Sequence, residues 1–259
     1  NNINSLSLGY FVSNNSEFAK YAKKAFLRLS EVLPKYLVYA GYSYSEYCDC
    51  DPHEAVKDPS KVTKFIFAPG NEEKKGLYDT YWAASRFGTS GMDGNIVKTL
   101  AEAYDLICDA IDIDGKPVFS DSEKELISKN CLVESALLGF YDTLINNKAV
   151  YNRQGVASVG LATGSVLLTR FGIDGLIRTF DEWYLPDGGT PESASYNIMT
   201  VSGIYTYGYS LRDYSDPDDF VPSEGEVKYS HFNANKDTIF DEVWQNMLWT
   251  SNGDFTYPP

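Results

Sequence analysis

Side chains suited to binding a sugar are unusually frequent in this sequence. Its 259 residues include 20 tyrosines, 14 phenylalanines and 4 tryptophans. Tyrosine and tryptophan offer a flat apolar face beside a polar tip, which matches the C–H faces and hydroxyl groups of a saccharide. Each aromatic residue taken alone is better explained as an ordinary core or surface side chain. The composition therefore favours a carbohydrate ligand but assigns no residue to it.

Acidic side chains in predicted loops could supply a general acid and a general base. A glycoside hydrolase needs two such carboxylates to protonate the leaving oxygen and to activate water. No two of the loop acids form a matching pair, so hydrolysis on an (α/α) barrel is kept only as an alternative. The acids concerned are Asp187, Glu192, Asp213 and Asp216.

The four cysteines give little support to a metal centre. Cys48 and Cys50 stand too close for an easy disulfide with each other, and His53 nearby suggests zinc, but no second ligand pair with zinc-like spacing follows. Cys108 and Cys131 fall on the apolar faces of predicted helices, where free buried thiols are the simpler interpretation. We expect no metal site and no cofactor.

The net charge limits the partners. It is formally −14 at pH 7, which repels nucleic acid and anionic membranes, so we expect neither as a partner. An acidic polymer would need a local basic patch, although screening limits the repulsion to about 8 Å at physiological salt. No stretch approaches the roughly 20 consecutive apolar residues of a membrane span.

The two ends of the chain suggest a piece of a longer protein. The sequence opens at Asn1 without Met and stops at Tyr257-Pro258-Pro259 without a charged tail. We therefore expect a mature or excised segment that continues in the natural protein. Asn14-Asn15-Ser16 is a possible N-glycosylation sequon, which fits a secreted protein.

The candidate residues lie on predicted helices or in the loops that connect them. Apolar residues at a period of 3.6 predict the first helix at 16–33, and a Ser120–Glu123 capping box opens a later one. Gly172 is predicted to end one helix and Ile173 to begin the next. The predicted helices are 16–33, 94–111, 120–145, 154–170, 173–184, 193–211 and 236–249, with a long excursion at 35–75 and loops at 186–189 and 213–226.

This order of elements predicts an all-α fold. Strands do not alternate with the helices, so a parallel α/β sheet is unfavourable. Successive amphipathic helices with short connections favour stacked antiparallel hairpins, which can form a bundle, a solenoid or a closed toroid. No strict repeat of fixed period occurs, which argues against a regular solenoid.

Three segments, taken in their order along the chain, narrow the choice among these helical folds. They are Trp82-Ala83-Ala84-Ser85-Arg86-Phe87 with Leu100-Ala101-Glu102-Ala103-Tyr104-Asp105-Leu106, then Asn146-Asn147 through Tyr151-Asn152-Arg153-Gln154-Gly155, and Asp187-Gly188-Gly189 with Glu192-Ser193-Ala194-Ser195-Tyr196. In order and spacing they resemble the heparinase II/III-like polysaccharide lyases. That family has a similar Trp–Arg stretch before an L-A-E-A-Y-D-L helix, an Asn at the start of a small-residue helix, and a D-G-x-x-x-E-x-S-x-Y signature.

The resemblance implies a fold and a partner. It implies an incomplete (α/α) toroid built from antiparallel helical hairpins, in which residues 1–259 form one domain, truncated at its C-terminal end. A β-sandwich domain would normally follow. The protein would be secreted or periplasmic, and its partner would be an acidic polysaccharide that contains uronic acid.

The same resemblance assigns the catalytic roles in a β-elimination. This reaction needs a base at C5, an acid at the departing O4 and a group that neutralises the neighbouring carboxylate. Tyr196 takes the acid or acid/base role and Asn152 binds the substrate carboxylate. An unperturbed tyrosine titrates near 10, so a tyrosine base needs a nearby cation, for which Arg153 is the candidate.

Four further residues are assigned to substrate binding by the resemblance. Gln154, Glu192 and Tyr151 would contact or orient the substrate. Arg86 is a candidate for a subsite contact because its planar fork matches a carboxylate.

The sequence departs from the family at the positions of its histidines. Arg153 and Asn197 stand where many members have His, and neither His53 nor His231 lies in a matched motif. The alternative function is a non-catalytic carbohydrate-binding or structural toroid module of a larger extracellular protein.

Structural explanations also compete at the individual positions. Asn152 could cap a helix, and Glu192 could cap the helix near Ser193. Arg153 could pair with an acid such as Glu134, and Arg86 could be purely structural.

Overall fold

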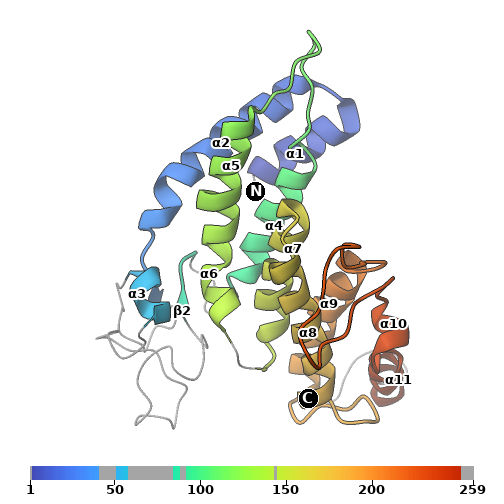
Figure 1. Ribbon diagram of the computed structural model, residues 1–259. Coiled ribbons are helices and arrows are strands. Elements are labelled where there is room, and N and C mark those ends of the chain that lie inside the picture. Colours follow the sequence, from blue (N-terminus) through green and yellow to red (C-terminus); the bar gives the residue numbers. More distant parts are fainter. Residues whose placement is uncertain (1, 41–50, 58–83, 88–91, 143–144, 252–259) are drawn as a thin grey trace.

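Helices make up most of the described residues in a computed structural model of the chain (Figure 1). The structure describes residues 2–40, 51–57, 84–87, 92–142 and 145–251. Strands β1 (Tyr39–Ala40) and β2 (Ala84–Ser85) pair antiparallel, with Tyr39 opposite Ser85. The prediction of an all-α fold is confirmed, since this two-residue ladder is the whole of the sheet within these ranges.

The helices follow the predicted order, with additional ones at Asn2–Ser13, at Pro52–Lys57 within the predicted excursion, and at Ala234–Asp237. They are α1 (Asn2–Ser13), α2 (Ser16–Val32), the 3₁₀ turn η1 (Leu33–Lys35), α3 (Pro52–Lys57), α4 (Gly94–Asp105), α5 (Asp121–Ile127), the π-helical turn η3 (Ser128–Val133), α6 (Glu134–Tyr141), α7 (Ala149–Thr163), α8 (Val166–Glu182), α9 (Ala194–Ser210), α10 (Ala234–Asp237) and α11 (Phe240–Thr250).

The predicted capping box forms at the start of α5. The Ser120 hydroxyl accepts a hydrogen bond from the Glu123 amide, and the Glu123 carboxylate accepts one from the Ser120 amide. Two amides that a first helical turn leaves unpaired are thereby satisfied. The helix continues through η3 into α6 and ends at Tyr141, slightly before the predicted boundary.

The predicted helix break at Gly172 is wrong. The chain turns instead at Gly164, which has a φ of 69°, and the Ser165 side chain caps α8. Gly172 lies inside α8, where a Cβ would overlap the Cβ of Ala157 in α7. The missing side chain at Gly172 therefore permits close helix packing, while Gly164 supplies the left-handed turn.

Two hydrophobic cores share α7 as a common wall. The N-terminal core contains Val156 and Val159 of α7, and the C-terminal core contains Val150 and Ala157 of the same helix. Figure 1 shows α7 between α4 and α8, which are its main packing partners. Every residue of α7 from Asn152 to Gly160 is buried, as the small-residue composition predicted.

Glycine allows α4 and α7 to touch at backbone distance. A Cβ added to Gly155 would lie 2.7 Å from the Gly94 Cα, and one added to Gly94 would overlap the Tyr151 carbonyl group. The side-chain oxygen of Asn152 accepts a hydrogen bond of 3.2 Å from the Gly94 amide. This crossing fixes the first turns of α7 against the start of α4.

A buried ion pair anchors the acidic segment that follows α9. Asp216 is 5% exposed, and its Oδ2 lies 2.6 Å from an Arg170 guanidinium nitrogen in α8. The same carboxylate accepts hydrogen bonds from the Tyr229 amide at 2.7 Å and the Tyr214 hydroxyl at 3.0 Å. The predicted surface loop at 213–226 is confirmed, since most of its residues are exposed and none lies in a helix, and the buried pair holds it on α8 through Asp216.

The last helix buries more of its apolar face than the sequence predicted. A chain truncated before the next helix would leave the apolar face of Val243, Met247 and Leu248 open. Val243 and Met247 are instead buried in the C-terminal core. Leu248, the third residue of that face, is 62% exposed.

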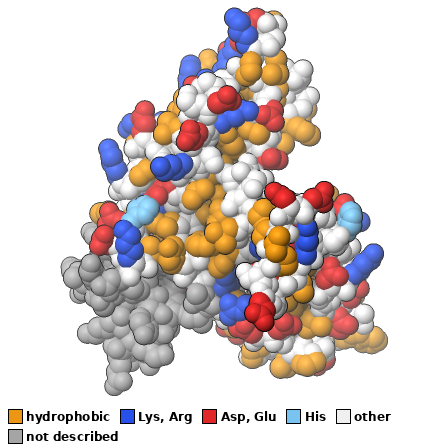
Figure 2. All heavy atoms as spheres, in the orientation of Figure 1, with side chains coloured by type: hydrophobic (Ala, Val, Ile, Leu, Met, Phe, Trp, Pro, Cys, Tyr) orange, Lys and Arg blue, Asp and Glu red, His pale blue; other side chains and the backbone are white. Residues whose placement is uncertain are grey.

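The visible surface is mixed in charge. Figure 2 shows acidic and basic side chains interspersed over this face, with hydrophobic side chains gathered towards its middle. None of the helices within the described ranges has both the length and the apolar character needed to cross a membrane.

The contact between α4 and α7 predicts an unusual response to alanine. Gly155→Ala should lower the free energy of unfolding by about 1–3 kcal/mol, because the new methyl group overpacks a backbone contact. The measurement is urea unfolding followed by circular dichroism.

Gly9→Ala in α1 is the matched control. Its nearest neighbour is the partly exposed ring of Phe18 at 3.1 Å, which can move aside. At such a site the helix propensity of alanine should offset the contact and leave stability within about 1 kcal/mol. Equal effects at the two glycines would contradict the close approach of α4 and α7.

Candidate functional site

Tyr196 is the one predicted catalytic residue that reaches the surface. It lies in the first turn of α9, just after the N-cap Ser193, and is 49% exposed. Its hydroxyl makes no hydrogen bond with any other described residue. The phenol is therefore available for a ligand.

The loop before α9 is held by packing against α11. Gly188 has a φ of 78°, and a Cβ there would overlap the carbonyl group of Glu242. The Asp187 side chain accepts a hydrogen bond of 3.0 Å from the Gly189 amide. The Asp-Gly-Gly motif thus has a structural reason: it sets where α9 begins, and with it the position of Tyr196.

Two contacts fasten the start of α7 to the start of α9. The Asn147 amide nitrogen donates a hydrogen bond of 2.9 Å to the Glu192 carboxylate. The Tyr151 hydroxyl donates to the carbonyl oxygen of Met199. We call the region of Asn147, Lys148, Tyr151, Glu192 and Tyr196 the α7–α9 junction. Glu192 therefore links two helices. The Ser193 hydroxyl lies 3.0 Å from the Ser195 hydroxyl and makes no capping hydrogen bond with the described backbone of α9.

Lys148 is a chemically unusual group at this junction. It is only 9% exposed, and desolvation lowers the pKa of its ammonium group to about 8. An amine with such a pKa can take or give a proton near neutral pH. Lys148 lies within the Asn146–Gly155 motif, but the sequence gives it no role because its burial depends on the packing around it.

Asn152 does not face open space. It is 6% exposed; its oxygen accepts from the Gly94 amide at 3.2 Å, and its nitrogen donates to the Asp142 carboxylate at 3.3 Å. Helix α7 begins at Ala149 with Lys148 as N-cap, so Asn152 is not the cap either. Both ends of this amide hold α4 and the end of α6 against α7.

Arg153 lies inside the fold. It is 1% exposed, with its guanidinium carbon 5.0 Å from the centre of the Phe171 ring. Desolvation lowers the pKa of this group, and the negative charge of Asp142 opposes that shift. Gly175 makes room for it, since a Cβ there would overlap the Arg153 side chain. Glu134, the acid suggested as its partner, pairs with Arg86 instead.

Two predicted substrate-binding residues are used for helix packing. The Gln154 amide exchanges hydrogen bonds of 3.1 and 3.2 Å with the Thr206 hydroxyl of α9. Tyr151 bonds α9 as described, and burial raises the pKa of its phenol. Neither side chain offers its polar atoms to solvent in the way that Tyr196 does.

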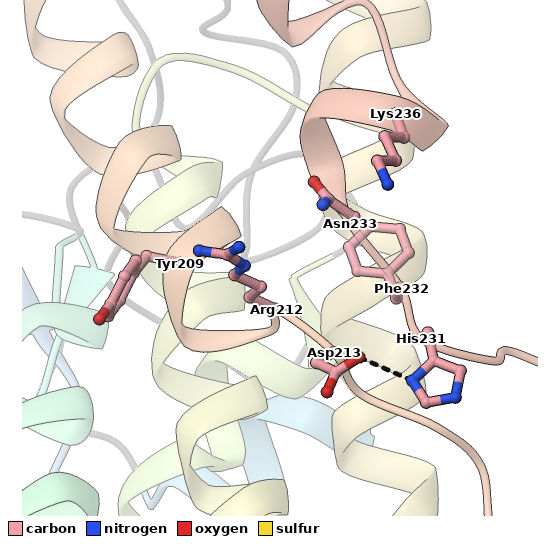
Figure 3. Close-up of a pocket in the computed structure, with 7 residues that line it drawn as sticks. All are labelled: Tyr209, Arg212, Asp213, His231, Phe232, Asn233 and Lys236. Carbon is pink, nitrogen blue, oxygen red and sulfur yellow. Dashed lines mark hydrogen bonds and ion pairs between the residues drawn. The ribbon is translucent and has the colours of Figure 1, made fainter.

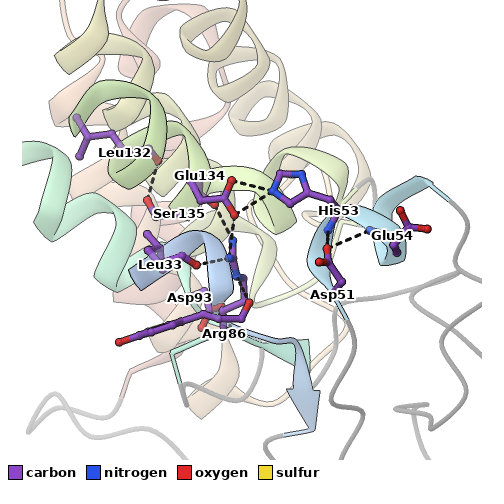
Figure 4. Close-up of polar contacts among 10 residues, drawn as sticks. Leu33, Asp51, His53, Glu54, Arg86, Asp93, Leu132, Glu134 and Ser135 are labelled. Atoms are coloured by element: carbon purple, nitrogen blue, oxygen red, sulfur yellow. Dashed lines mark hydrogen bonds and ion pairs between the residues drawn. The ribbon is translucent and has the colours of Figure 1, made fainter. Parts of the chain in front are cut away.

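Arg86 is the centre of a separate polar cluster (Figure 4). Its guanidinium donates to the carbonyl oxygens of Leu33, Tyr36 and Glu134 at 2.7–3.1 Å. It also lies 2.8 Å from the Glu134 carboxylate, which His53 Nε2 approaches at 2.9 Å. These contacts join the ends of α2 and α3 to α6, which favours the structural explanation for Arg86. Trp82 and Ala83 of the same motif lie outside the described residues.

The described cysteines are free thiols. Cys131 is buried, which raises the pKa of its thiol to about 12, and Cys108 is partly exposed. A thiol with a raised pKa is a poor nucleophile near neutral pH. Cys48 and Cys50 lie outside the described residues.

Comparison with known families, curated proteins and solved structures finds no match for this chain. The likeness to heparinase II/III-like lyases therefore rests on the residues of the three motifs.

The Arg86 cluster predicts a large loss of stability. Arg86→Ala should lower the free energy of unfolding by about 3–5 kcal/mol, since it leaves the largely buried Glu134 carboxylate without its main cationic partner. Arg28→Ala is the control, because Arg28 pairs with Glu31 on the surface and such pairs contribute at most about 1 kcal/mol. Thermal and urea unfolding of the two variants check this, and similar losses would be inconsistent with a special role for Arg86.

The buried Lys148 predicts a pH-dependent stability difference. Its folded pKa is below the unfolded value of 10.5, so the folded state disfavours the charged form. Lys148→Met should be more stable than the parent below pH 8, by up to about 3 kcal/mol. The advantage should shrink as the pH rises from 8 to 10.5, where the unfolded lysine also loses its proton.

Urea unfolding at several pH values measures this difference. The exposed Lys129→Met serves as the control and should show no such pH dependence. A Lys148→Met curve parallel to the parent between pH 7 and pH 10.5 would show that Lys148 is not desolvated.

Proposed function

We propose that this protein is a polysaccharide lyase that cleaves a uronic-acid-containing polysaccharide by β-elimination at the α7–α9 junction. The observation that carries the proposal is the exposed phenol of Tyr196 in the first turn of α9, four residues after Glu192, whose carboxylate accepts a hydrogen bond from Asn147, the neighbour of Lys148 in sequence. The motif containing Tyr196 is also the part of the sequence that most resembles the lyase signature.

The reaction sets the roles of the groups at the junction. The proton leaves C5, the C4–O4 bond breaks, a C4=C5 double bond forms, and O4 receives a proton. Tyr196 supplies the acid, and in its phenolate form it also takes the C5 proton. Lys148 supplies the cation that favours the phenolate and offsets charge on the substrate carboxylate, since opposite charge favours the ionised form.

The buried residues of the motif act through position. Asn152 and Arg153 hold α7 in place, and Tyr151, Gln154 and Glu192 fix α9 relative to α7. In this proposal only Glu192 and Tyr196, of the residues assigned by resemblance, lie where a substrate can approach. Arg86 supports the fold through the Glu134 cluster.

The wider architecture belongs to the same proposal. The helices would form an incomplete (α/α) toroid of antiparallel hairpins within one domain spanning 1–259, followed in the natural protein by a β-sandwich domain. The partner is an acidic polysaccharide and the location is secreted or periplasmic.

A non-catalytic carbohydrate-binding module is the second candidate. The observation that favours it is the burial of Asn152 and Arg153, which the resemblance assigns to binding the substrate carboxylate and to stabilising the Tyr196 phenolate respectively. Such a module would bind the same polymer without cleaving it.

Tyr196→Phe tests the proposal. The substitution removes the proton donor and should lower kcat by about 10²–10⁴-fold on a responsive polymer such as alginate, polygalacturonate or a glycosaminoglycan, with little change in KM. The measurement is the ultraviolet absorbance of the new C4=C5 double bond. Tyr21→Phe, at an exposed tyrosine of α2, is the control and should keep full activity.

The remaining outcomes separate the two candidates. Full activity in Tyr196→Phe would overturn the mechanism. Binding of the polymer by the parent protein, with no unsaturated product from any member of the panel, would favour the binding module.

A further inference from the structure

A polar groove lies at the far end of α9 from Tyr196. One hollow of about 540 Å³ is lined by residues from the end of α9, the segment after it and α10 (Figure 3). A second hollow of about 410 Å³ shares Tyr209, Arg212, Asn233 and Lys236 with the first and extends to Tyr205 and Trp244. We call the two together the α9–α10 groove.

The rim of the groove is fixed by an unusual backbone arrangement. Asp213 and His231 flank the bridge between Tyr214 and Phe232, and both adopt left-handed conformations, with φ of 68° and 53°. Their side chains meet, with His231 Nδ1 2.7 Å from Asp213 Oδ1. Non-glycine residues with positive φ cost free energy and persist only where the surroundings hold them. The buried Arg170–Asp216 pair, which anchors this segment on α8, supplies that support.

Two cations in the groove lack protein partners. Arg212 and Lys236 are exposed, and neither makes an ion pair or a side-chain hydrogen bond with another described residue. Lys20 and Lys124 are paired with carboxylates, and Lys129 has no ion pair within the described residues; Arg212 and Lys236 differ from these in lining the same hollow. In a chain with a net charge of −14, two unpaired cations facing one hollow indicate an anionic ligand.

Aromatic rings line the same groove. Tyr209 is 72% exposed and Tyr205 is 56% exposed, and the Tyr205 and Trp244 rings lie 6.5 Å apart. Exposed aromatic faces suit the C–H faces of pyranose rings, and the Arg212 fork suits a carboxylate. Asn233 adds an amide that can bond to hydroxyl groups. Cations beside aromatic faces fit an acidic saccharide better than an inorganic anion.

We propose that the α9–α10 groove is a second binding site for an acidic oligosaccharide, separate from the α7–α9 junction. Carboxylates of the ligand pair with Arg212 and Lys236, while sugar rings lie against Tyr209 and the Tyr205–Trp244 pair. Tyr196 and Tyr209 are thirteen residues apart in one helix, about 20 Å along its axis, so one sugar unit cannot contact both. The choice of a uronic-acid ligand rests on the proposed function.

A direct binding measurement tests whether this site exists. The probe is a uronic-acid hexasaccharide, such as oligogalacturonate or oligomannuronate, titrated calorimetrically into Tyr196→Phe protein, in which cleavage should be slowed by about 10²-fold or more. The Arg212→Gln/Lys236→Gln double variant in that background should bind at least tenfold more weakly, because two charge-assisted contacts are lost. Tyr209→Ala should also weaken binding. A neutral hexasaccharide should bind the protein poorly and should not respond to the double variant.

A matched double variant controls for net charge. Arg28→Gln/Lys129→Gln removes two exposed positive charges from α2 and η3 and should leave binding of the hexasaccharide unchanged. Equal weakening in both double variants would show that the loss comes from long-range electrostatic attraction, and would overturn the site. Unchanged binding in Arg212→Gln/Lys236→Gln would also overturn it.

Kinetics on the polymer separate this inference from the proposed function. In a protein that retains Tyr196, the groove double variant should raise KM and leave kcat unchanged. Unsaturated product together with a normal KM would overturn the second site alone. Binding that depends on Arg212 and Lys236, with no unsaturated product from any polymer, would support the site and overturn the lyase.

Discussion

The fold depends on how closely α7 approaches its neighbours. Gly94 and Gly155 bring α4 and α7 to backbone contact, and Gly172 allows α8 to pack against Ala157 on another side of the helix. Because α7 contributes to both hydrophobic cores, these contacts determine the relative placement of the two halves of the described chain. Side chains at these glycines would force the helices apart, and the buried polar contacts around α7 require the present spacing.

Burial around α7 gives its polar residues different chemical characters. Arg153 is enclosed and stacked on Phe171, so its charge serves the interior of the fold. Lys148, at the first turn, keeps an amine whose pKa is lowered to about 8 by desolvation. Tyr196 remains open on the adjoining helix. A proton-transfer site needs groups of the last two kinds, and their proximity to the Asn147–Glu192 link is the physical basis for placing the proposed chemistry there.

The distribution of charge distinguishes the groove at the other end of α9. Buried pairs such as Arg170–Asp216 use their charges to fix the chain, whereas Arg212 and Lys236 face a hollow with aromatic walls. An acidic protein can bind an acidic polymer where such cations are concentrated, because screening confines the general repulsion to short range. The Tyr214–Phe232 bridge and the buried Arg170–Asp216 pair hold the rim of the groove, and a preformed rim would reduce the entropy lost on binding the proposed ligand.

The sequence alone determined the features that depend on neighbouring residues in the chain. The capping box at Ser120, the helix from Ser16 and the helix beginning after Ser193 all follow from local hydrogen bonds and apolar periodicity. Only tertiary structure decided which face of each helix is covered. It buried Asn152, lowered the pKa of Lys148 and brought Arg212 and Lys236 to the lining of one hollow, because burial and cavities depend on helices distant in sequence.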